Sequence, residues 1–580
     1  MDTSKITQIK DQIHYEVART EPPEGFPRFH DIPKGRYTSQ EFYDLEQQHI
    51  FSNTWVVAGR EDQIPNKGDF FTFKKLGEPM LLIRGNDGSI RCFYNTCQHR
   101  GAPVVRDESG TSRRLRCQYH SWSYDITDGS LVAVPDEHDF VDLDRTQRCL
   151  PQVSCDTFEG FIFVNKNPNA EPLLDSLGLA AEMLEPLDNL SLKEVYRESI
   201  IVPCNWKVTA EAFLEVYHFK HIHSNKEGWA TLDSRRAAMG LYPGGHSRMI
   251  TGYSDQHVNL SGMQAWDDWK PLDNGDFKTI NSTSQEYLDM LDCTSTAVSF
   301  FPNTIIPLGS FGYPVLLFWP LDIENTLLEW WYYGPADWEG DAIPVHWQKR
   351  SKQFDQIMDE DKYNMAPMWE SLKSPALTGI PINYQERRIW HLHEEIDRRI
   401  GSQNIPSNLL MDQVLEPYLE SYRMFNFQDI YHIGIRVPNL SRAMEEMGSS
   451  LSLTWAEPIQ TEAQSIWTPE EGQRYLPLKF VYSCEGPQHI ELLEGPPDSI
   501  WDGRQDSGVH HVGVWVDDVA NQTEQFLKNG WTLLASSVSP EQGYGGYTYI
   551  APNSGMIVEL VSRSILPRFE RWWAGGSLAK

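Results

Sequence analysis

The sequence predicts an α+β multidomain protein, in which an all-β domain and a mixed domain precede a C-terminal domain with an internal repeat. At 580 residues the chain is too long for a single hydrophobic core. Short alternating strands with turn residues between them fill residues 51–165, whereas strand-like runs and long helical patterns are mixed in residues 166–405. One seven-residue pattern recurs within residues 429–565, which indicates two similar modules.

The domain boundaries follow from the places where these patterns change. A helical pattern capped by Ser39 closes the N-terminal segment, and a linker with one helix separates the mixed domain from the repeat. The predicted parts are 1–50 for a helical segment that belongs to the mixed domain, 51–165 for the all-β domain, 166–405 for the mixed domain, 406–428 for the linker, 429–565 for the repeat domain and 566–580 for a tail.

Composition and charge narrow the possible partners. The formal net charge of −31 argues against nucleic acid or an anionic membrane surface. The eight cysteines show no paired framework, which indicates a reducing compartment, and residues 1–16 carry no apolar signal core. Residues 293–321 are uncharged, but four prolines interrupt them, so we expect buried strands rather than a membrane span. The expected location is cytoplasmic.

Two short motifs each pair one cysteine with one histidine. They are Cys97-x-His99 and, seventeen residues later, Cys117-x-x-His120. A single zinc ion could take these four ligands, but zinc modules of this composition usually keep both cysteines in one Cys-x2–4-Cys knuckle. The pairing favours a [2Fe–2S] cluster in which one iron binds both thiolates and the other binds both imidazoles. The motifs resemble a Rieske centre, although Ser121 stands where that family usually has glycine.

A second ligand-rich stretch runs from Glu211 to His223 and reads as a helix. In a continuous helix Glu211, Glu215 and His218 would share one face. His223 lies five residues after His218, so the helix must end or bulge between them if both bind one ion. His221 would then not be a ligand. A polar surface helix with scattered histidines is the alternative interpretation.

This stretch, with Asn205-Trp206-Lys207 before it, resembles the Glu-x-Phe-x-Glu-x-Tyr-His-x4-His signature of Rieske non-haem iron oxygenases. The resemblance implies a helix-grip-like catalytic domain with an antiparallel sheet. It also implies that His218, His223 and one carboxylate hold Fe(II) and leave positions open for O2 and substrate. In the family, an acid three positions before the first histidine connects it to the Rieske centre of a neighbouring subunit. Glu215 holds that place here, and a glutamate there is similar to the branch that acts on quaternary ammonium compounds.

The third iron ligand must come from further along the chain. Four acids lie in one helical pattern at about 346–373, namely Asp355, Asp359, Glu360 and Asp361. Asp361 falls within the apolar stripe of this pattern, whereas Asp355 and Asp359 point the other way. A carboxylate on an inward apolar stripe is costly unless it binds something. We therefore choose Asp361, and the family resemblance implies the same residue.

The C-terminal repeat places histidines and glutamates at equivalent positions. Residues 431–437 recur as residues 510–516, and each half ends in a strand that carries a glutamate. The repeat resembles the vicinal oxygen chelate fold of paired βαβββ modules, with the glyoxalase and epimerase branch nearest. The ligand places of that fold hold His432, Glu491, His511 and Glu559. They suit a divalent ion such as Mn, Co, Ni, Zn or Fe, and a repurposed domain that only packs against the oxygenase is the alternative.

Together these resemblances imply the terminal component of a Rieske-type mono- or dioxygenase. No Gly-rich dinucleotide loop and no ferredoxin-type cysteine run occurs in the sequence. Electrons from NAD(P)H are therefore expected through a separate reductase and/or ferredoxin, and the family pattern implies a homotrimer. We expect hydroxylation of a small hydrophobic, first of all aromatic, substrate, because aromatic and methionine side chains surround the expected pocket; they are Phe213, Phe219, Met239, Met249, Phe300 and Phe301. The alternatives are hydroxylation or N-demethylation of a methylated amine, and a bifunctional protein whose C-terminal domain isomerises or cleaves the oxygenated product.

Overall fold

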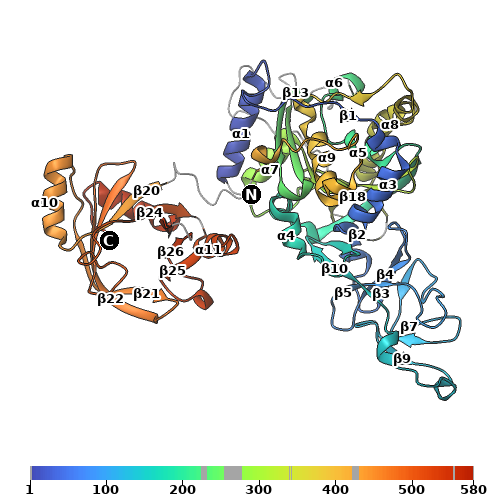
Figure 1. The fold of residues 1–580 in the computed structure, drawn as a ribbon, viewed down its shortest axis with the longest axis horizontal. Helices are drawn as coiled ribbons and strands as arrows, with labels where there is room; N and C mark the ends of the chain where they lie inside the picture. The colour runs from blue at the N-terminus through green and yellow to red at the C-terminus, as the bar shows by residue number, and fades with distance from the viewer. Residues whose placement is uncertain are drawn as a thin grey trace. The chain divides into compact units, whose positions relative to one another are not determined.

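The computed structural model describes residues 3–223, 232–253, 277–336, 338, 340, 342–420, 430–516, 518–552 and 555–578. The chain divides into two compact units, Met1–Ser421 and Tyr422–Lys580 (Figure 1). The division falls within the stretch predicted as a linker, whose residues 421–428 lie outside the described part of the chain. Before that point Leu409, Met411 and Leu415 are buried in the core of the first unit, so the first half of the predicted linker belongs to that unit.

The predicted all-β domain consists of two antiparallel sheets. The larger sheet has the strand order β2-β11-β10-β5-β4-β3-β6 and the smaller one the order β7-β8-β9. The strands are β2 (Val56–Arg60), β3 (Asp69–Phe73), β4 (Met80–Arg84), β5 (Ile90–Tyr94), β6 (Ser109–Thr111), β7 (Leu115–Arg116), β8 (Ser123–Tyr124), β9 (Leu131–Ala133), β10 (Gln152–Phe158) and β11 (Phe161–Asn165). Both sheets contribute to one hydrophobic core, and Cys97 and Cys117 are among its buried members.

The mixed domain is organised on a seven-stranded antiparallel sheet of order β12-β18-β17-β16-β15-β14-β13. The strands are β12 (Leu192–Val202), β13 (Leu232–Leu241), β14 (Ser247–Tyr253), β15 (Thr294–Phe300), β16 (Thr304–Leu308), β17 (Tyr313–Pro320) and β18 (Thr326–Pro335). The uncharged run 293–321 forms three of these strands, as predicted, and its side chains are almost all buried. No helix among the described residues is long and apolar enough to cross a membrane.

Helices from both ends of the first unit pack on this sheet (Figure 1). They are α1 (Thr3–Ala18), α8 (Val345–Leu372) and α9 (Arg387–Ile400). Helix α3 (Gln40–Glu46) packs on α9. The long helix predicted at about 346–373 is confirmed, and Ser39 caps α3 by accepting a hydrogen bond from the amide of Phe42. Helix α4 (Leu173–Leu177) is short, because it ends at Gly178 with φ +48°. A short 3-10 turn follows it.

The second unit is a closed eight-stranded barrel made of two βαβββ modules, as the repeat predicts. Its strand order is β20-β23-β22-β21-β25-β26-β27-β24, so each module supplies four adjacent strands. The first module contains β20 (Ile430–Arg436), α10 (Leu440–Leu451), β21 (Ile459–Thr468), β22 (Gly472–Tyr482) and β23 (His489–Glu494). The second contains β24 (Gly508–Val516), α11 (Val519–Lys528), β25 (Thr532–Ser536), β26 (Tyr547–Ala551) and β27 (Ile557–Ser562). The predicted tail forms helix α12 (Leu566–Trp573), and Trp572 on it is fully buried.

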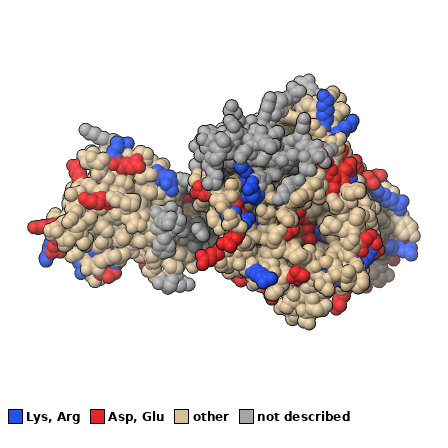
Figure 2. All heavy atoms as spheres, turned by 90° about the horizontal axis from the view of Figure 1, so that it is seen from above, with Lys and Arg blue, Asp and Glu red and all other residues tan. Residues whose placement is uncertain are grey.

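The surface carries both signs of charge. On the face shown in Figure 2, acidic and basic side chains lie interspersed among the described residues. This mixed pattern accompanies the net charge of −31. It is typical of a solvated acidic surface.

Candidate metal centres

The two Cys/His motifs form matching loops in the all-β domain. The amide of Gly101 donates to the carbonyl of Cys97 at 3.0 Å, and the amide of Ser121 donates to the carbonyl of Cys117 at 2.9 Å. Gly101 and Ser121 therefore occupy equivalent places, and both have positive φ, +74° and +61°. Glycine, which the family usually has at this position, adopts the left-handed conformation without steric cost. Ser121 must adopt the same conformation against its steric preference.

The side chains of these loops fit an iron–sulfur cluster. The rings of His99 and His120 lie 4.6 Å apart, and the His99 ring stacks on Trp122 at 4.8 Å. The Nδ1 atom of His99 is buried and makes no hydrogen bond to any residue that the structure describes. Two thiols and two imidazoles are the ligand set of a Rieske-type [2Fe–2S] cluster.

The surroundings of the thiols also favour metal binding. Burial raises the pKa of Cys97, and the Tyr124 hydroxyl, 3.3 Å from the Cys97 sulfur, partly offsets that rise. A buried thiol of this kind becomes a thiolate when a metal replaces its proton. The Tyr124 hydroxyl also accepts from the amide of Gln98 at 3.0 Å. Tyr124 is a supporting residue that the sequence motifs did not reveal, because it lies outside both of them.

The stretch from Glu211 to His223 is not one helix, which corrects the prediction. Helix α5 (Trp206–Glu211) ends at Glu211, and a turn leads to the short helix α6 (Phe219–Ile222). The break precedes His218 rather than following it, so His218 and His223 flank α6 at its two ends. The predicted common face of Glu211, Glu215 and His218 does not exist. The Glu211 carboxylate instead accepts a hydrogen bond from the Tyr37 hydroxyl, whereas the Glu215 carboxylate accepts one from the amide of His218 at 3.2 Å.

His218, His223 and Asp361 come together in the first unit. The Oδ1 of Asp361 lies 3.2 Å from the Nε2 of His223 and 3.6 Å from the Nε2 of His218. One ligand atom from each of the three residues lies within 4.8 Å of the others, as a metal ion requires. Asp361 is buried on α8, and His221 is exposed.

Two glutamates hold the imidazoles of this site in orientation. The Nδ1 of His218 contacts the Glu215 carboxylate, and the Nδ1 of His223 lies 2.9 Å from the Oε2 of Glu360. The Nε2 of both rings is thereby left toward Asp361, the arrangement in which a carboxylate fixes the tautomer of a metal-binding histidine. Burial alone would lower the pKa of His223, but Asp361 and Glu360 raise it. The carboxylates therefore attract a cation to this site.

The other acids of α8 take different places. Asp359 is two-thirds exposed and pairs with Lys362 at 2.6 Å. Asp355 was predicted to point away from the core, and this was wrong, because it accepts from the Trp330 indole at 3.0 Å and from the Tyr196 hydroxyl at 2.9 Å. Both partners lie on the sheet beneath α8. Glu360 was considered only as a ligand candidate, and no sequence pattern indicated its contact with His223.

Glu211 lies in a separate buried network of charged and polar groups. The Tyr37 hydroxyl donates to its carboxylate at 2.9 Å, and the Nε2 of His393 lies 2.9 Å from its Oε1. Arg36 donates to the Nδ1 of His393, which leaves the proton of that ring on Nε2. Burial raises the pKa of Glu211 to about 8, despite the lowering effects of Tyr37, Lys207 and Arg36. Near neutral pH the carboxyl group is therefore largely protonated.

Replacing Glu211 by Gln is expected to stabilise the protein increasingly as the pH rises from 5 to 8. The raised pKa means that the folded state keeps a proton that the unfolded state loses. This contribution is present below about pH 4.5 and is lost as the pH rises through about 8. Glutamine resembles the protonated acid and does not ionise. The variant therefore avoids a loss in the free energy of unfolding on the order of a few kcal/mol as the pH rises. Thermal unfolding at pH 5 and at pH 8.5 measures the difference.

The matched control is Glu41→Gln, which changes an exposed glutamate on α3. Its effect on the unfolding temperature should be the same at both pH values. The groups that face Glu211 are Tyr37, Glu46, Arg36, Lys207 and His393. A Glu211→Gln variant whose stability relative to the unsubstituted protein does not change with pH would show that these groups keep the carboxyl ionised.

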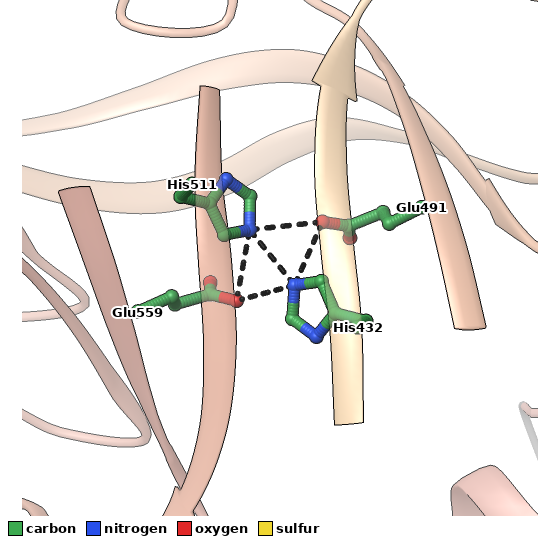
Figure 3. A group of neighbouring side chains, drawn as sticks. All are labelled: His432, Glu491, His511 and Glu559. Atoms are coloured by element: carbon green, nitrogen blue, oxygen red, sulfur yellow. Dashed lines mark hydrogen bonds and ion pairs between the residues drawn. The ribbon is translucent and has the colours of Figure 1, made fainter. Parts of the chain in front are cut away.

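The second unit holds four predicted ligands at the middle of its barrel (Figure 3). The Nε2 atoms of His432 and His511 lie 2.8 Å apart. The Oε2 of Glu491 lies 3.3 Å from the first of these nitrogens and 3.2 Å from the second, and the Oε2 of Glu559 lies 3.3 Å from both. These separations suit four donor atoms around one divalent ion. All four side chains are buried.

The electrostatics of this group also point to a cation. Burial alone would lower the pKa of His511, but Glu559 and Glu491 raise it to about 9. The imidazoles in turn lower the pKa of both glutamates against the effect of burial. Two buried carboxylates thus need positive charge beside them, which a divalent ion supplies directly. The residues present fit a metal.

Two glycines make room for the histidine rings. His432 lies opposite Gly513 across the β20–β24 ladder, and His511 lies opposite Gly434. A Cβ atom at Gly513 would overlap the His432 ring, and one at Gly434 would overlap the His511 ring. The sequence signal is the His-x-Gly pattern shared by both copies of the repeat, and its meaning is clear only from the strand pairing. Each module therefore supplies one histidine ligand and the space for the histidine of the other module.

Three family models match the chain. Residues 54–152 match the Rieske [2Fe-2S] domain, residues 188–402 the ring hydroxylating alpha subunit (catalytic domain), and residues 431–549 the glyoxalase/bleomycin resistance protein/dioxygenase superfamily. Each match covers one of the regions described above. Together the first two imply a [2Fe–2S] cluster and a mononuclear iron. The third match ends before Glu559.

Curated relatives are similar to part of the chain. The chain is 32% identical over 252 residues to the 2-aminobenzenesulfonate 2,3-dioxygenase subunit alpha of Alcaligenes sp., which covers 42% of this chain and 63% of the relative. It is 32% identical over 194 residues to the carnitine monooxygenase oxygenase subunit of Escherichia coli, a match that covers 33% of this chain and 52% of the relative. Biphenyl 2,3-dioxygenase subunit alpha of Rhodococcus jostii is 36% identical over 190 residues, covering 31% and 41%. The chain thus spans about half the length of the curated relatives it matches.

Solved structures show the same fold. A quaternary ammonium Rieske monooxygenase in complex with an inhibitor aligns with a TM-score of 0.54 and 21% identity, covering 66% of this chain and all of that chain. Naphthalene 1,2-dioxygenase from Rhodococcus sp. bound to indole aligns with a TM-score of 0.51 and 19% identity, covering 69% and 98%. These likenesses establish the architecture of the first unit.

Proposed function

Because this chain joins a Rieske [2Fe–2S] domain and a ring-hydroxylating α-subunit catalytic domain to a glyoxalase-like domain, we propose that it is the terminal component of a multicomponent oxygenase. The group of His218, His223 and Asp361 is the observation that carries this proposal, because it offers two imidazoles and one carboxylate to a single ion. Bound there, Fe(II) supplies the redox chemistry of O2 activation. Cys97, His99, Cys117 and His120 hold the cluster.

The protein side chains orient this site and connect it to its source of electrons. Glu360 fixes the ring of His223, and Glu215 fixes the ring of His218. Electrons would come from a separate reductase and/or ferredoxin, and the cluster held by a neighbouring subunit of a homotrimer would supply them to this site. Glu215 completes this path, because its carboxylate contacts an iron-binding imidazole from the side opposite to the metal-facing Nε2.

Glu215→Gln is expected to leave both iron centres loaded but to slow electron transfer between them at least about tenfold. The amide keeps the shape of the side chain and loses the charge that faces His218. Single-turnover oxidation of the reduced cluster, followed by visible absorbance in the presence of substrate and O2, measures this step. Glu215→Asp should recover part of the rate if the shorter side chain still reaches the imidazole.

Glu360→Gln is the matched comparison, since it changes the equivalent contact on His223. It should weaken iron binding and leave the rate of cluster oxidation unchanged in the iron-loaded fraction. Normal single-turnover oxidation in Glu215→Gln would exclude Glu215 from the electron path.

A small hydrophobic substrate is supported by the side chains next to the iron site. Val216, Phe219, Ala237, Met239 and Met249 form a separate buried apolar cluster. The Phe219 ring contacts those of His218 and His223 at 4.8 and 5.5 Å. Of the residues expected to surround the pocket, Phe300 and Phe301 belong instead to the main core, and Phe213 packs on Phe318. Three of the six expected residues therefore support the proposed pocket.

The experiment that tests the function is O2 uptake with a reductase and two substrate panels. Benzene-type rings should yield hydroxylated or dihydroxylated products under aromatic oxygenation. The second candidate, oxygenation of a methylated amine, is favoured by Glu215 and by the likeness to the carnitine monooxygenase oxygenase subunit. It should yield formaldehyde or a hydroxylated amine. O2 uptake that no member of either panel stimulates would contradict both substrate classes.

We also propose that His432, Glu491, His511 and Glu559 bind a divalent metal in the second unit. The proposal is supported by the interlocked histidines and glycines, because a domain that only packs against its neighbour has no need of that space. Two roles are open to a loaded site: a second chemical step on the oxygenated product, or structural support of the barrel. Product identity distinguishes them, because only the first role alters the final product when the metal is lost.

A further inference from the structure

His510 lies beside a predicted metal ligand because of an irregularity in the β20–β24 ladder. Gly434 pairs with His511, but the next residue, Ile435, pairs with Val509, so His510 is an extra residue in β24. Such bulges redirect a side chain and are frequent next to functional sites. The Nδ1 of His510 lies 2.9 Å from the Nδ1 of His511. Figure 3 shows that the other nitrogen of His511 faces the ligand group.

This contact determines where the protons lie. When the Nε2 of His511 binds a cation, its proton is on Nδ1, which can only donate. The Nδ1 of His510 must then accept, so the proton of that ring is on Nε2. This second N–H is buried, and no described residue accepts from it. His510 is 6% exposed, and its ring packs against Tyr549 at 5.5 Å.

Arg436 brings a second donor to the same end of the ladder. It follows His432 and Gly434 at alternate positions on β20, and these residues share one face of the strand. Its Cα pairs with that of Gly508, two residues before His510. One terminal nitrogen of the guanidinium pairs with Asp506, and the other donates to the carbonyl of Ile500 at 3.4 Å. The Nε is buried and has no acceptor among the described residues.

The strand register places both donors at the same end of the β20–β24 ladder, next to His511. A buried N–H without an acceptor is costly, and proteins rarely keep one without a use. Here two such groups stand beside four predicted metal ligands. What would satisfy them is an oxygen atom with negative charge.

We propose that His510 and Arg436 form an anion-binding pair in the barrel, which receives the carboxylate of a small organic acid whose second oxygen reaches the metal. The substrate class is thus a hydroxy or oxo carboxylate. This inference rests on the proposed metal site, and it adds a specificity-determining pair that the ligand group alone does not provide. The Nε2–H of His510 and the Nε–H of Arg436 donate to the carboxylate, and the Tyr549 ring packs against the ring of His510.

The test uses the full chain loaded with Co2+, with 2-hydroxybenzoate as the acidic probe and 2-hydroxybenzyl alcohol as its neutral counterpart. Binding is followed by calorimetry and by the visible spectrum of Co2+. Protein with Glu491→Ala and Glu559→Ala supplies the background from the iron site. Arg436→Met should weaken 2-hydroxybenzoate binding roughly 10- to 100-fold, with no change in Co2+ affinity or in binding of the alcohol. Asp506→Asn, which removes only the exposed partner of Arg436, should leave the affinity for the acid within about twofold.

His510→Phe provides a second readout. It removes the donor to the carboxylate and also the acceptor for the Nδ1 of His511, so the affinity for Co2+ should fall roughly tenfold as well. Equal binding of the acid to Arg436→Met and to the unsubstituted protein would overturn the anion pair while leaving the metal site intact. Co2+ binding without binding of the acid would mean that water satisfies both donors, which overturns the inference too. Failure of Co2+ to bind above the background would overturn both proposals.

Discussion

Asp361→Ala is expected to abolish substrate oxygenation. Loss of a residue that only hydrogen-bonds to a metal ligand lowers activity by up to roughly 100-fold, and loss of the ligand itself should lower turnover further. Asp361 supplies the carboxylate of the proposed iron-binding group, at 3.2 Å from the Nε2 of His223. Without it two imidazoles remain, which leaves a weak and incomplete site for Fe(II). Iron content should fall by about one atom per chain, while the visible spectrum of the Rieske cluster persists. Metal analysis and product formation measure the two effects.

Asp359→Ala is the matched control, because the residue is two positions away on the same helix but exposed and paired with Lys362. Its loss should change activity and stability very little, since exposed ion pairs contribute about 0–1 kcal/mol. Cys97→Ala should give the complementary result, with a bleached cluster and a mononuclear site that still takes up iron. Loss of iron in Asp359→Ala together with an active Asp361→Ala would contradict the assignment.

Gly513→Ala is expected to empty the metal site of the second unit. The added Cβ would overlap the His432 ring, and the neighbouring strand cannot yield without breaking the β20–β24 ladder. Overpacking of this kind costs about 1–3 kcal/mol. If the ring turns away to avoid it, one of four ligands is lost, and the affinity for Mn2+, Co2+ or Zn2+ should fall more than about 100-fold. Gly434→Ala should do the same through His511.

The control is Gly546→Ala, because a Cβ at that position in the same unit meets nothing within 4 Å. It should bind metal normally. Oxygen consumption should continue in all these variants, since the second unit is a compact body of its own. A changed final product in Gly513→Ala would assign a chemical step to the barrel, and an unchanged product would assign it a structural role. Undiminished metal binding in both Gly513→Ala and Gly434→Ala would contradict a site between His432 and His511.

Features that depend on short spacing or on repetition could be predicted from the residues alone. The Cys97/His99 and Cys117/His120 motifs indicated a two-iron cluster because four ligands within two short loops have few other uses. Asp361 could be chosen over Asp359 because both lie in one long helix, where a period of 3.6 residues separates the inward face from the outward one. The βαβββ repeat could be recognised because its two copies carry the same pattern without a gap.

Contacts between distant parts of the chain became known only from the fold. Glu211 and Glu215 look equivalent in a helical pattern, but contacts with Tyr37 and with His218, respectively, separate them. Likewise, the contact of Glu360 with His223 joins two elements far apart in the chain. The fit of each histidine into the glycine of the opposite module depends on strand register, as does the extra residue His510. Local periodicity is encoded in neighbouring residues, so a short segment is enough to reveal it. The contacts between distant residues depend instead on which elements pack together. The packing energy is shared among residues from several segments, so no single segment reveals these contacts.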